Sequence, residues 1–120
     1  PQVYGSASST TGLISWGSTK GAVLEAQKLL SEQGMETKFL HLNFLNPFPA
    51  EAVTEFCQSC RKILSVEQNI TGQLAGLIRE KTGRKIENQF LKYDGRPFFP
   101  EEIAEKVSKL SLPKKVKETL

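Results

Sequence analysis

Short apolar runs alternate with helix-like segments along most of the chain, and this alternation limits the possible folds more than any other feature. The runs are too short for helices and predict buried strands at 12–16, 37–42, 63–66 and 87–91. After each run, apolar residues recur at helical spacing, in stripes that include Ala26, Val53, Leu74 and Ile103. Strands that alternate with helices predict a mostly parallel sheet. We therefore expect an α/β fold, a small three-layer Rossmann-like sandwich.

The 120 residues suffice for one domain with a core of its own. Residues 1–11 are polar, rich in serine and threonine, and without periodicity, so we expect a linker from a missing N-terminal domain. The α/β domain is predicted at 12–112, followed by a basic tail at 113–120. The chain begins with a proline, and we expect it to be part of a longer protein.

Charge and hydropathy exclude several kinds of partner. The formal net charge is +3, and charges of both signs are spread along the chain without a basic block, so we expect no nucleic-acid partner. No apolar run approaches the ~20 residues that cross a membrane, and the N-terminus lacks a signal-peptide pattern. The 2 cysteines are too few for a disulfide scaffold. These features predict a cytoplasmic protein with no membrane partner.

The loops that follow parallel strands emerge at one edge of a sheet, where ligands and partners usually bind. We therefore expect four loops to lie together there: 17–20, 43–49, 67–72 and 93–97. The loop after the 63–66 strand carries Glu67 and Gln68, which turn chemistry alone does not explain. In and just after the 93–97 loop, Tyr93, Arg96, Phe98 and Phe99 add aromatic rings and a guanidinium that suit a docking surface.

The first of these loops, in "ISWGSTKG", is compatible with a phosphate cradle or with a simple strand-to-helix turn. Its glycines match neither the G-x-G-x-x-G dinucleotide fingerprint nor the P-loop. There remains a helix N-terminus at which Ser18 and Thr19 are the predicted capping hydroxyls. The same exposed N–H groups can bind an anion, and this alternative stays open.

The remaining candidate groups favour structural interpretations. Cys57 and Cys60 form a C-x-x-C on the apolar face of a predicted helix, near its end, where the dipole opposes a thiolate. Further zinc or cluster ligands are lacking, so buried packing is the expectation and dithiol redox chemistry a minor alternative. His41, within a predicted strand, is expected to be a hydrogen-bonded residue of the sheet.

Several long, ordered motifs together resemble one known family. They are "GLISWGSTKGAVLEAQKLL", "GMETKFLHLNFLNPFPAEAV", "KILSVEQNITGQLAGLIRE" and "KYDGRPFFPEEI". This succession covers almost the whole chain and resembles the C-terminal region of the alpha subunit of 2-oxoacid:ferredoxin oxidoreductases, nearest to the 2-oxoglutarate type. The region is similar to the C-terminal domain of transketolases, which shows a similar strand-glycine-helix opening.

The resemblance implies a complex that oxidatively decarboxylates a 2-oxoacid to its coenzyme A thioester and passes electrons through iron–sulfur clusters to ferredoxin. Such complexes use thiamine diphosphate with Mg²⁺. The resemblance places the thiamine site between the N-terminal domain of the alpha subunit and the beta subunit, which are the implied partners. No catalytic residue of the family has a matching position here. We therefore expect a non-catalytic assembly domain, inactive in isolation, without a cofactor or metal of its own.

The positions that match the family pattern are expected to shape the edge that meets the rest of the complex. Those expected at the interface or at a possible anion site are Gly17, Ser18, Thr19, Lys20, Glu67, Asn69, Thr71, Gly72, Tyr93, Asp94, Gly95 and Arg96. A rival hypothesis from another class is a free-standing module that binds a phosphate, a nucleotide or coenzyme A at the helix N-terminus formed by Gly17–Thr19.

Overall fold

The computed structural model describes residues 1–69, 72–92 and 96–110. The strands are β1 (Gln2–Gly5), β2 (Thr11–Trp16), β3 (Lys38–Leu42), β4 (Lys62–Glu67) and β5 (Asn88–Leu91). The α-helices are α1 (Lys20–Glu32), α2 (Ala50–Gln58), α3 (Gln73–Thr82) and α4 (Pro100–Ser108), and a 3₁₀ turn, η1 (Gly17–Thr19), precedes α1. The predicted alternation of strands and helices is confirmed, with bounds that differ by one or two residues.

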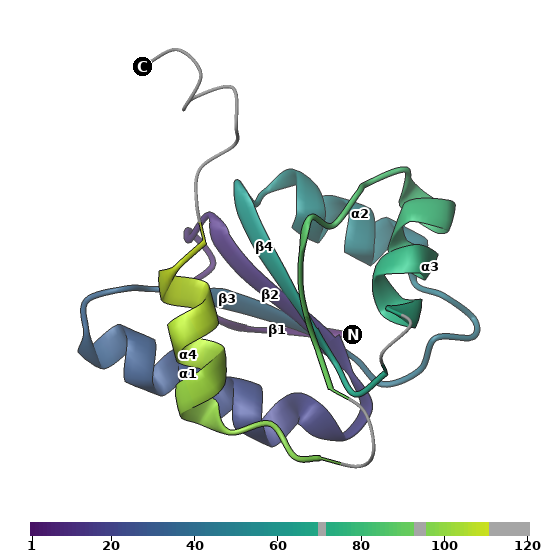
Figure 1. Ribbon diagram of the computed structural model, residues 1–120. Coiled ribbons are helices and arrows are strands. Elements are labelled where there is room, and N and C mark those ends of the chain that lie inside the picture. The colour runs from purple at the N-terminus through teal and green to yellow at the C-terminus, as the bar shows by residue number, and fades with distance from the viewer. Residues whose placement is uncertain (70–71, 93–95, 111–120) are drawn as a thin grey trace, which may run out of the picture.

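The strands form one sheet in the order β1-β3-β2-β4-β5. β2 pairs in parallel with both β3 and β4, and β4 pairs in parallel with β5. Helices α1 and α4 cover one face of the sheet, and α2 and α3 cover the other (Figure 1). The structure therefore confirms the predicted α/β class and its three layers.

Successive residues of the central strands are buried on opposite faces of the sheet. In β2, Leu13 packs with the α1 and α4 side chains, and Ile14 packs with those of α2 and α3. Both residues have no exposed surface. Burial on both faces is typical of parallel sheets and explains why these strands appear in the sequence as continuous apolar runs.

The expectation of a linker at residues 1–11 is wrong for its first part, because β1 pairs antiparallel with β3 at the edge of the sheet. Tyr4 packs against Phe39, with ring centroids 5.9 Å apart. Gly5 then turns the chain at φ 100°, where an added Cβ would lie 2.4 Å from the Thr37 carbonyl oxygen. Four residues, three of them exposed, are too few to show a period in the sequence. The predicted basic tail at 113–120 lies outside the described residues.

Candidate functional site

The carboxyl ends of β2, β3, β4 and β5 meet at one edge of the sheet, and the loops that leave them form the candidate site. Adjacent strands β2 and β4 continue into helices on opposite faces, α1 and α3. In open α/β sheets such a reversal creates a crevice in which ligands and partners bind. Here it holds a depression of about 250 Å³, lined by Trp16, Gly17, Ser18, Thr19 and Gln68.

The turn after β2 shows that the predicted helix cap is wrong. Thr19 occupies the position before α1, but its φ of −76° and ψ of −6° are helical, and it makes no side-chain cap bond. A capping side chain needs an extended backbone to reach the free N–H groups, and the preceding 3₁₀ turn removes that geometry. Thr19 is buried and donates its hydroxyl to the Trp16 carbonyl at 3.4 Å. Ser18 is exposed and donates its hydroxyl to Oε1 of Gln68 at 3.4 Å.

Two further side chains near this turn face away from the depression. The ammonium group of Lys20 lies 5.0 Å from the ring centroid of Tyr4 on β1, in a cation–π contact. His41 is buried at the end of β3, where its Nε2 lies 2.8 Å from the Gly17 carbonyl oxygen that accepts its hydrogen bond. The expectation that His41 is a hydrogen-bonded residue of the sheet is confirmed.

Glu67, at the end of β4, is buried and joins three parts of the edge. Both of its carboxylate oxygens accept the Leu74 N–H of α3, at 3.0 and 2.9 Å, and Oε1 also accepts the Trp16 indole N–H at 3.2 Å. Burial raises the pKa of Glu67, although these donors oppose the shift. Gly72, in the left-handed conformation, precedes α3 without a side-chain cap. The Glu67 carboxylate therefore replaces that cap and is engaged inside the protein.

Gln68 links loops that are far apart in the sequence. Its Oε1 accepts the Ser18 hydroxyl, and its Nε2 donates to the Arg96 carbonyl oxygen at 2.7 Å. One exposed amide thus bridges the loops that follow β2, β4 and β5. The predicted meeting of these loops at one edge is confirmed.

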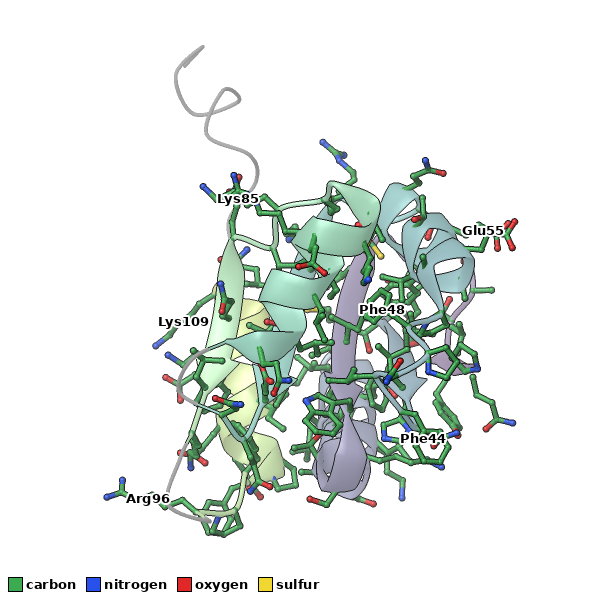
Figure 2. All side chains as sticks on the ribbon, turned by 90° about the vertical axis from the view of Figure 1, so that its right-hand side faces the viewer. Phe44, Phe48, Glu55, Lys85, Arg96 and Lys109 are labelled. Atoms are coloured by element: carbon green, nitrogen blue, oxygen red, sulfur yellow. The ribbon has the colours of Figure 1, made fainter. Side chains whose placement is uncertain are left out.

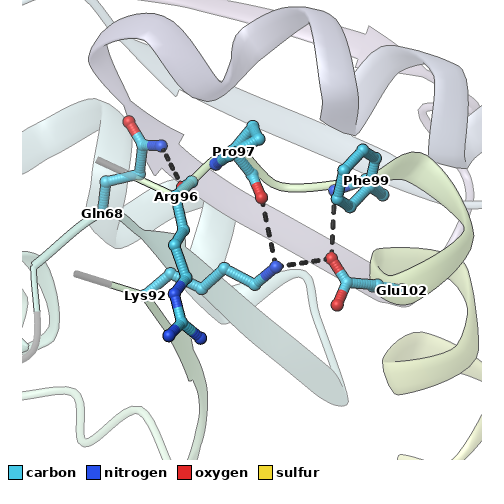
Figure 3. A network of polar contacts seen from close by, with 6 residues as sticks. All are labelled: Gln68, Lys92, Arg96, Pro97, Phe99 and Glu102. Atoms are coloured by element: carbon cyan, nitrogen blue, oxygen red, sulfur yellow. Dashed lines mark hydrogen bonds and ion pairs between the residues drawn. The ribbon is translucent and has the colours of Figure 1, made fainter. Parts of the chain in front are cut away.

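The loop after β5 is held by a polar network around Lys92 (Figure 3). The Lys92 ammonium donates to the Pro97 carbonyl oxygen at 3.1 Å and pairs with Oε1 of Glu102 at 2.6 Å. The same carboxylate oxygen accepts the Phe99 N–H at 3.2 Å, immediately before α4. These bonds hold the chain between Arg96 and Phe99 against the start of α4.

The other predicted site residues do not form one cluster of side chains. Asn69 donates its side-chain amide to Gln73 at 3.2 Å, within the turn that leads to α3. Gly72 is buried beneath Gln89, whose Oε1 would lie 2.6 Å from an added Cβ. Arg96 is exposed at the edge. The remaining predicted positions, which lie outside the described residues, are Thr71, Tyr93, Asp94 and Gly95.

The predicted site omits Phe44 and Lys92, whereas Phe99 was expected at the docking surface. Phe44, in the loop after β3, is 74% exposed, and Phe99 is 55% exposed. Figure 2 shows Phe44 and Arg96 at the same end of the protein, opposite Lys85. No sequence signal separates Phe44 from Leu45 and Phe48 of the same loop, which pack against the core. No sequence signal marks Lys92, since its partners lie up to ten positions away.

The two cysteines are free, buried and packed in the core between the sheet, α2 and α3, which confirms the structural interpretation. Burial raises the pKa of Cys57 to about 11, and the nearby Arg84 offsets only part of this shift. Burial also raises the pKa of Cys60, against the opposing charge of Lys38. Neither thiol has the lowered pKa of a reactive cysteine.

The donor groups of the described residues at this edge do not fit thiamine diphosphate with its metal or an iron–sulfur cluster. Within residues 1–69, 72–92 and 96–110 no group of three or more His, Cys, Asp and Glu side chains could hold a metal ion. The Glu67 carboxylate already accepts N–H groups from Trp16 and Leu74. No helix in the described ranges is long and apolar enough to span a membrane.

The fold and this edge define a class of α/β domain that is also present in transketolases. The structure superposes on transketolase from Campylobacter jejuni with a TM-score of 0.56 at 16% identity, over 88% of this chain and 16% of that one. At this identity the likeness concerns the fold alone.

Residues 10–103 match the family described as pyruvate:ferredoxin oxidoreductase core domain II. The chain belongs to this family and is a domain of a 2-oxoacid:ferredoxin oxidoreductase alpha subunit. It is 36% identical to the alpha subunit of 2-oxoacid:ferredoxin oxidoreductase 2 from Aeropyrum pernix, over 90% of this chain and 17% of that subunit. The chain thus spans about one sixth of the length of this relative.

A solved structure supports the same assignment. It is the 2-oxoglutarate:ferredoxin oxidoreductase from Magnetococcus marinus with 2-oxoglutarate, coenzyme A and succinyl-CoA bound. The TM-score is 0.82 at 34% identity, over 90% of this chain and 19% of that one.

Proposed function

We propose that this chain is a non-catalytic assembly domain of a thiamine-dependent 2-oxoacid:ferredoxin oxidoreductase. In this proposal the whole enzyme decarboxylates a 2-oxoacid oxidatively to its coenzyme A thioester and passes the electrons to ferredoxin. The rest of the alpha subunit and the beta subunit carry the cofactors. The domain contributes the edge formed by its loops after β2, β3, β4 and β5 as the surface on which those partners dock.

The observation that carries the proposal is that the polar side chains at the edge bind to other parts of the protein itself. Glu67 and His41, the groups best suited to acid–base chemistry, are buried and bonded to neighbouring backbone. Gln68 joins separate loops to one another, and Phe44 and Phe99 are left exposed beside them. Bonds that tie the loops together and exposed aromatic side chains suit a preformed docking surface better than a reaction centre.

We propose 2-oxoglutarate as the substrate of the whole enzyme. The support is the similarity to the Magnetococcus marinus enzyme, whose structure contains 2-oxoglutarate and succinyl-CoA. Substrate choice would then depend on parts of the enzyme other than this domain.

The test separates catalysis from assembly. The chain alone is assayed with 2-oxoglutarate, coenzyme A, thiamine diphosphate, Mg²⁺ and a dye acceptor, and we expect no turnover. It is then added to the alpha and beta subunits of its own enzyme after the matching region has been deleted from alpha. We expect association by gel filtration and recovery of turnover. Turnover by the chain alone would contradict the non-catalytic role, and lack of association would contradict the assembly role.

The rival module that binds coenzyme A has one observation in its favour, the depression beside Gly17–Thr19. Its volume of about 250 Å³ lies below the roughly 300–1,000 Å³ of typical ligand pockets. Lys20, the cation of this turn, lies over Tyr4 instead of facing the depression. Calorimetric titration with coenzyme A decides the matter: saturable binding that is lost in a Ser18→Ala, Thr19→Ala double variant would favour the rival.

A further inference from the structure

Lys92 occupies an aromatic cage at the margin of the core between the sheet, α1 and α4, to which Phe98 belongs and against which Phe90 packs. Its ammonium lies 5.9, 5.6 and 5.5 Å from the ring centroids of Phe90, Phe98 and Phe99. The pair with Glu102 and the bond to the Pro97 carbonyl complete its surroundings. The Lys92 side chain is 17% exposed. A cation that is desolvated against ring faces and paired with a carboxylate holds its neighbours far more firmly than an exposed ion pair does.

The residues held by this cage include an exposed cation and an exposed ring. The backbone of Arg96 is fixed by Gln68 on one side, and the next residue is fixed by Lys92 on the other. In the described part of the chain the Arg96 guanidinium makes no hydrogen bond or ion pair. Figure 2 shows its side chain projecting away from the body of the protein. Phe99, three residues on, is 55% exposed.

This arrangement has the chemistry of a binding anchor. Arginine and aromatic residues dominate the binding energy of protein interfaces, and a guanidinium pairs best with a carboxylate in a bidentate geometry. A backbone that is fixed before binding avoids part of the entropy cost of association. Lys92 and Lys109 are paired with acids of α4, and Lys106 lies over the Phe90 ring. An acid from a partner protein can therefore pair with Arg96 without breaking a contact within the described residues.

We infer that Lys92 is a positioning residue that presents Arg96 and Phe99 as a preformed anchor for a protein segment in which a carboxylate lies next to an apolar side chain. This inference rests on the proposed assembly function and names the chemistry of the surface that meets the partner. Arg96 pairs with the carboxylate, Phe99 covers the apolar neighbour, and Lys92 touches neither.

The first experiment measures the positioning itself and needs no partner. Amide hydrogen exchange at Phe99, whose N–H donates to the Glu102 carboxylate that Lys92 pairs with, is compared between the wild type and a Lys92→Met variant. We expect exchange in the variant to be faster by about tenfold, the scale of one lost charge-assisted hydrogen bond. Lys92→Arg keeps a cation and should restore slow exchange, and Glu102→Gln serves as a second loosening variant should Lys92→Met fold poorly.

Lys109→Met is the matched control. The Lys109–Glu105 pair has the same 2.6 Å distance and also involves α4, but its side chains are 71% and 64% exposed. Loss of an exposed pair should leave exchange at Phe99 unchanged. Exchange that is equally fast in the Lys92→Met and Lys109→Met variants, or unchanged in both, would overturn the positioning role.

The second experiment measures docking on the beta subunit together with an alpha subunit from which the matching region has been deleted. We expect Arg96→Ala to weaken binding by roughly 30-fold, as truncation of an interface hot spot does. Arg96→Lys should recover only part of the loss, because an ammonium cannot pair bidentately. The gap between wild type and Arg96→Ala should shrink as the salt concentration rises from about 0.05 to about 0.5 M. Arg79→Ala, an exposed cation on α3, is the control and should bind as the wild type does.

The outcomes separate this inference from the proposed function. If the wild-type chain does not bind, the assembly function fails and the anchor fails with it, while hydrogen exchange still decides the positioning role of Lys92. If the wild type binds and Arg96→Ala binds within twofold of it, the anchor is wrong and the assembly function stands. Loss of binding in Lys92→Met and Arg96→Ala, but not in Lys109→Met, supports both parts.

Discussion

Replacement of Glu67 tests how a buried carboxylate supports the edge of the sheet. The residue is 1% exposed, and its oxygens accept N–H groups from Leu74 and Trp16. Glu67→Ala removes every acceptor, whereas Glu67→Gln keeps one carbonyl oxygen and loses the charge. The two variants therefore separate the hydrogen bonds from the cost of burying a charge.

The size of the alanine effect follows from the groups left without a partner. The buried Leu74 N–H loses its acceptor, which costs about 1–3 kcal/mol. The Trp16 indole is only half-buried and can bond to water, so it adds less. With the void left by the side chain, we expect Glu67→Ala to lower the free energy of unfolding by roughly 2–4 kcal/mol. Urea unfolding at pH 7, followed by circular dichroism and by the fluorescence of Trp16, measures this difference.

Comparison with the Glu67→Gln variant shows how the stability of the protein depends on the ionisation of Glu67. Burial raises the pKa of Glu67 in the folded state above its unfolded value of 4.5, so the folded protein binds a proton more readily than the unfolded chain. The stability of the wild type relative to Glu67→Gln should therefore increase as the pH falls from 7 through the raised pKa. The gain should be about 1.4 kcal/mol for each unit of the shift, and it should level off below the unfolded pKa.

The opposite trend would refute this reasoning. If the wild type lost stability relative to Glu67→Gln between pH 7 and pH 5, the donors from Leu74 and Trp16 would outweigh burial and the carboxylate would stabilise the fold in its charged form. An unchanged free energy of unfolding in Glu67→Ala would show that Glu67 does not hold the start of α3.

The remaining predictions concern three other parts of the chain. Gly5→Ala should destabilise the fold by about 1–3 kcal/mol, because the residue has a positive φ and closely approaches Thr37; Gly76→Ala, at an open helical position, should be neutral or stabilising by up to about 1 kcal/mol. Cys57 has a pKa of about 11, so at pH 8 only roughly one Cys57 thiol in a thousand is the reactive thiolate. We therefore expect thiol labelling of Cys57 in the folded protein to be no faster than this small thiolate fraction allows. Rapid labelling would show that the thiol is accessible. Phe44→Ser should change the free energy of unfolding by less than about 0.5 kcal/mol, since the ring is 74% exposed. The same variant should bind more weakly to the beta subunit and the alpha subunit that lacks the matching region. An unaltered affinity would show that Phe44 is not part of the docking surface.

Local sequence was sufficient for the elements that lie in the centre of the sheet. β2, β3 and β4 are apolar because both of their faces are covered, and the helices carry stripes at helical spacing because one side of each is buried. These patterns arise within single segments, so they can be read without knowledge of the neighbours. The burial of Cys57 and the hydrogen-bonded state of His41 follow from the same local context.

Features that depend on a distant partner were missed or only partly predicted. β1 is a strand because β3 offers it a free edge, and nothing in Gln2–Gly5 announces that pairing. Ser18 fits a capping pattern, yet the 3₁₀ turn directs its hydroxyl to Gln68 instead. Glu67 was expected at an interface and is buried as the acceptor for α3.

The sequence by itself thus determined the α/β class, the order of the elements and the edge at which the loops meet, because periodicity and chain connectivity are local properties. Only the tertiary structure decided that β2 lies between β3 and β4, and hence that Gln68 reaches both Ser18 and Arg96. Strand order depends on the packing of helices onto both faces of the sheet. The contacts that it creates join residues 28 and 50 positions apart, a distance over which no local pattern carries information.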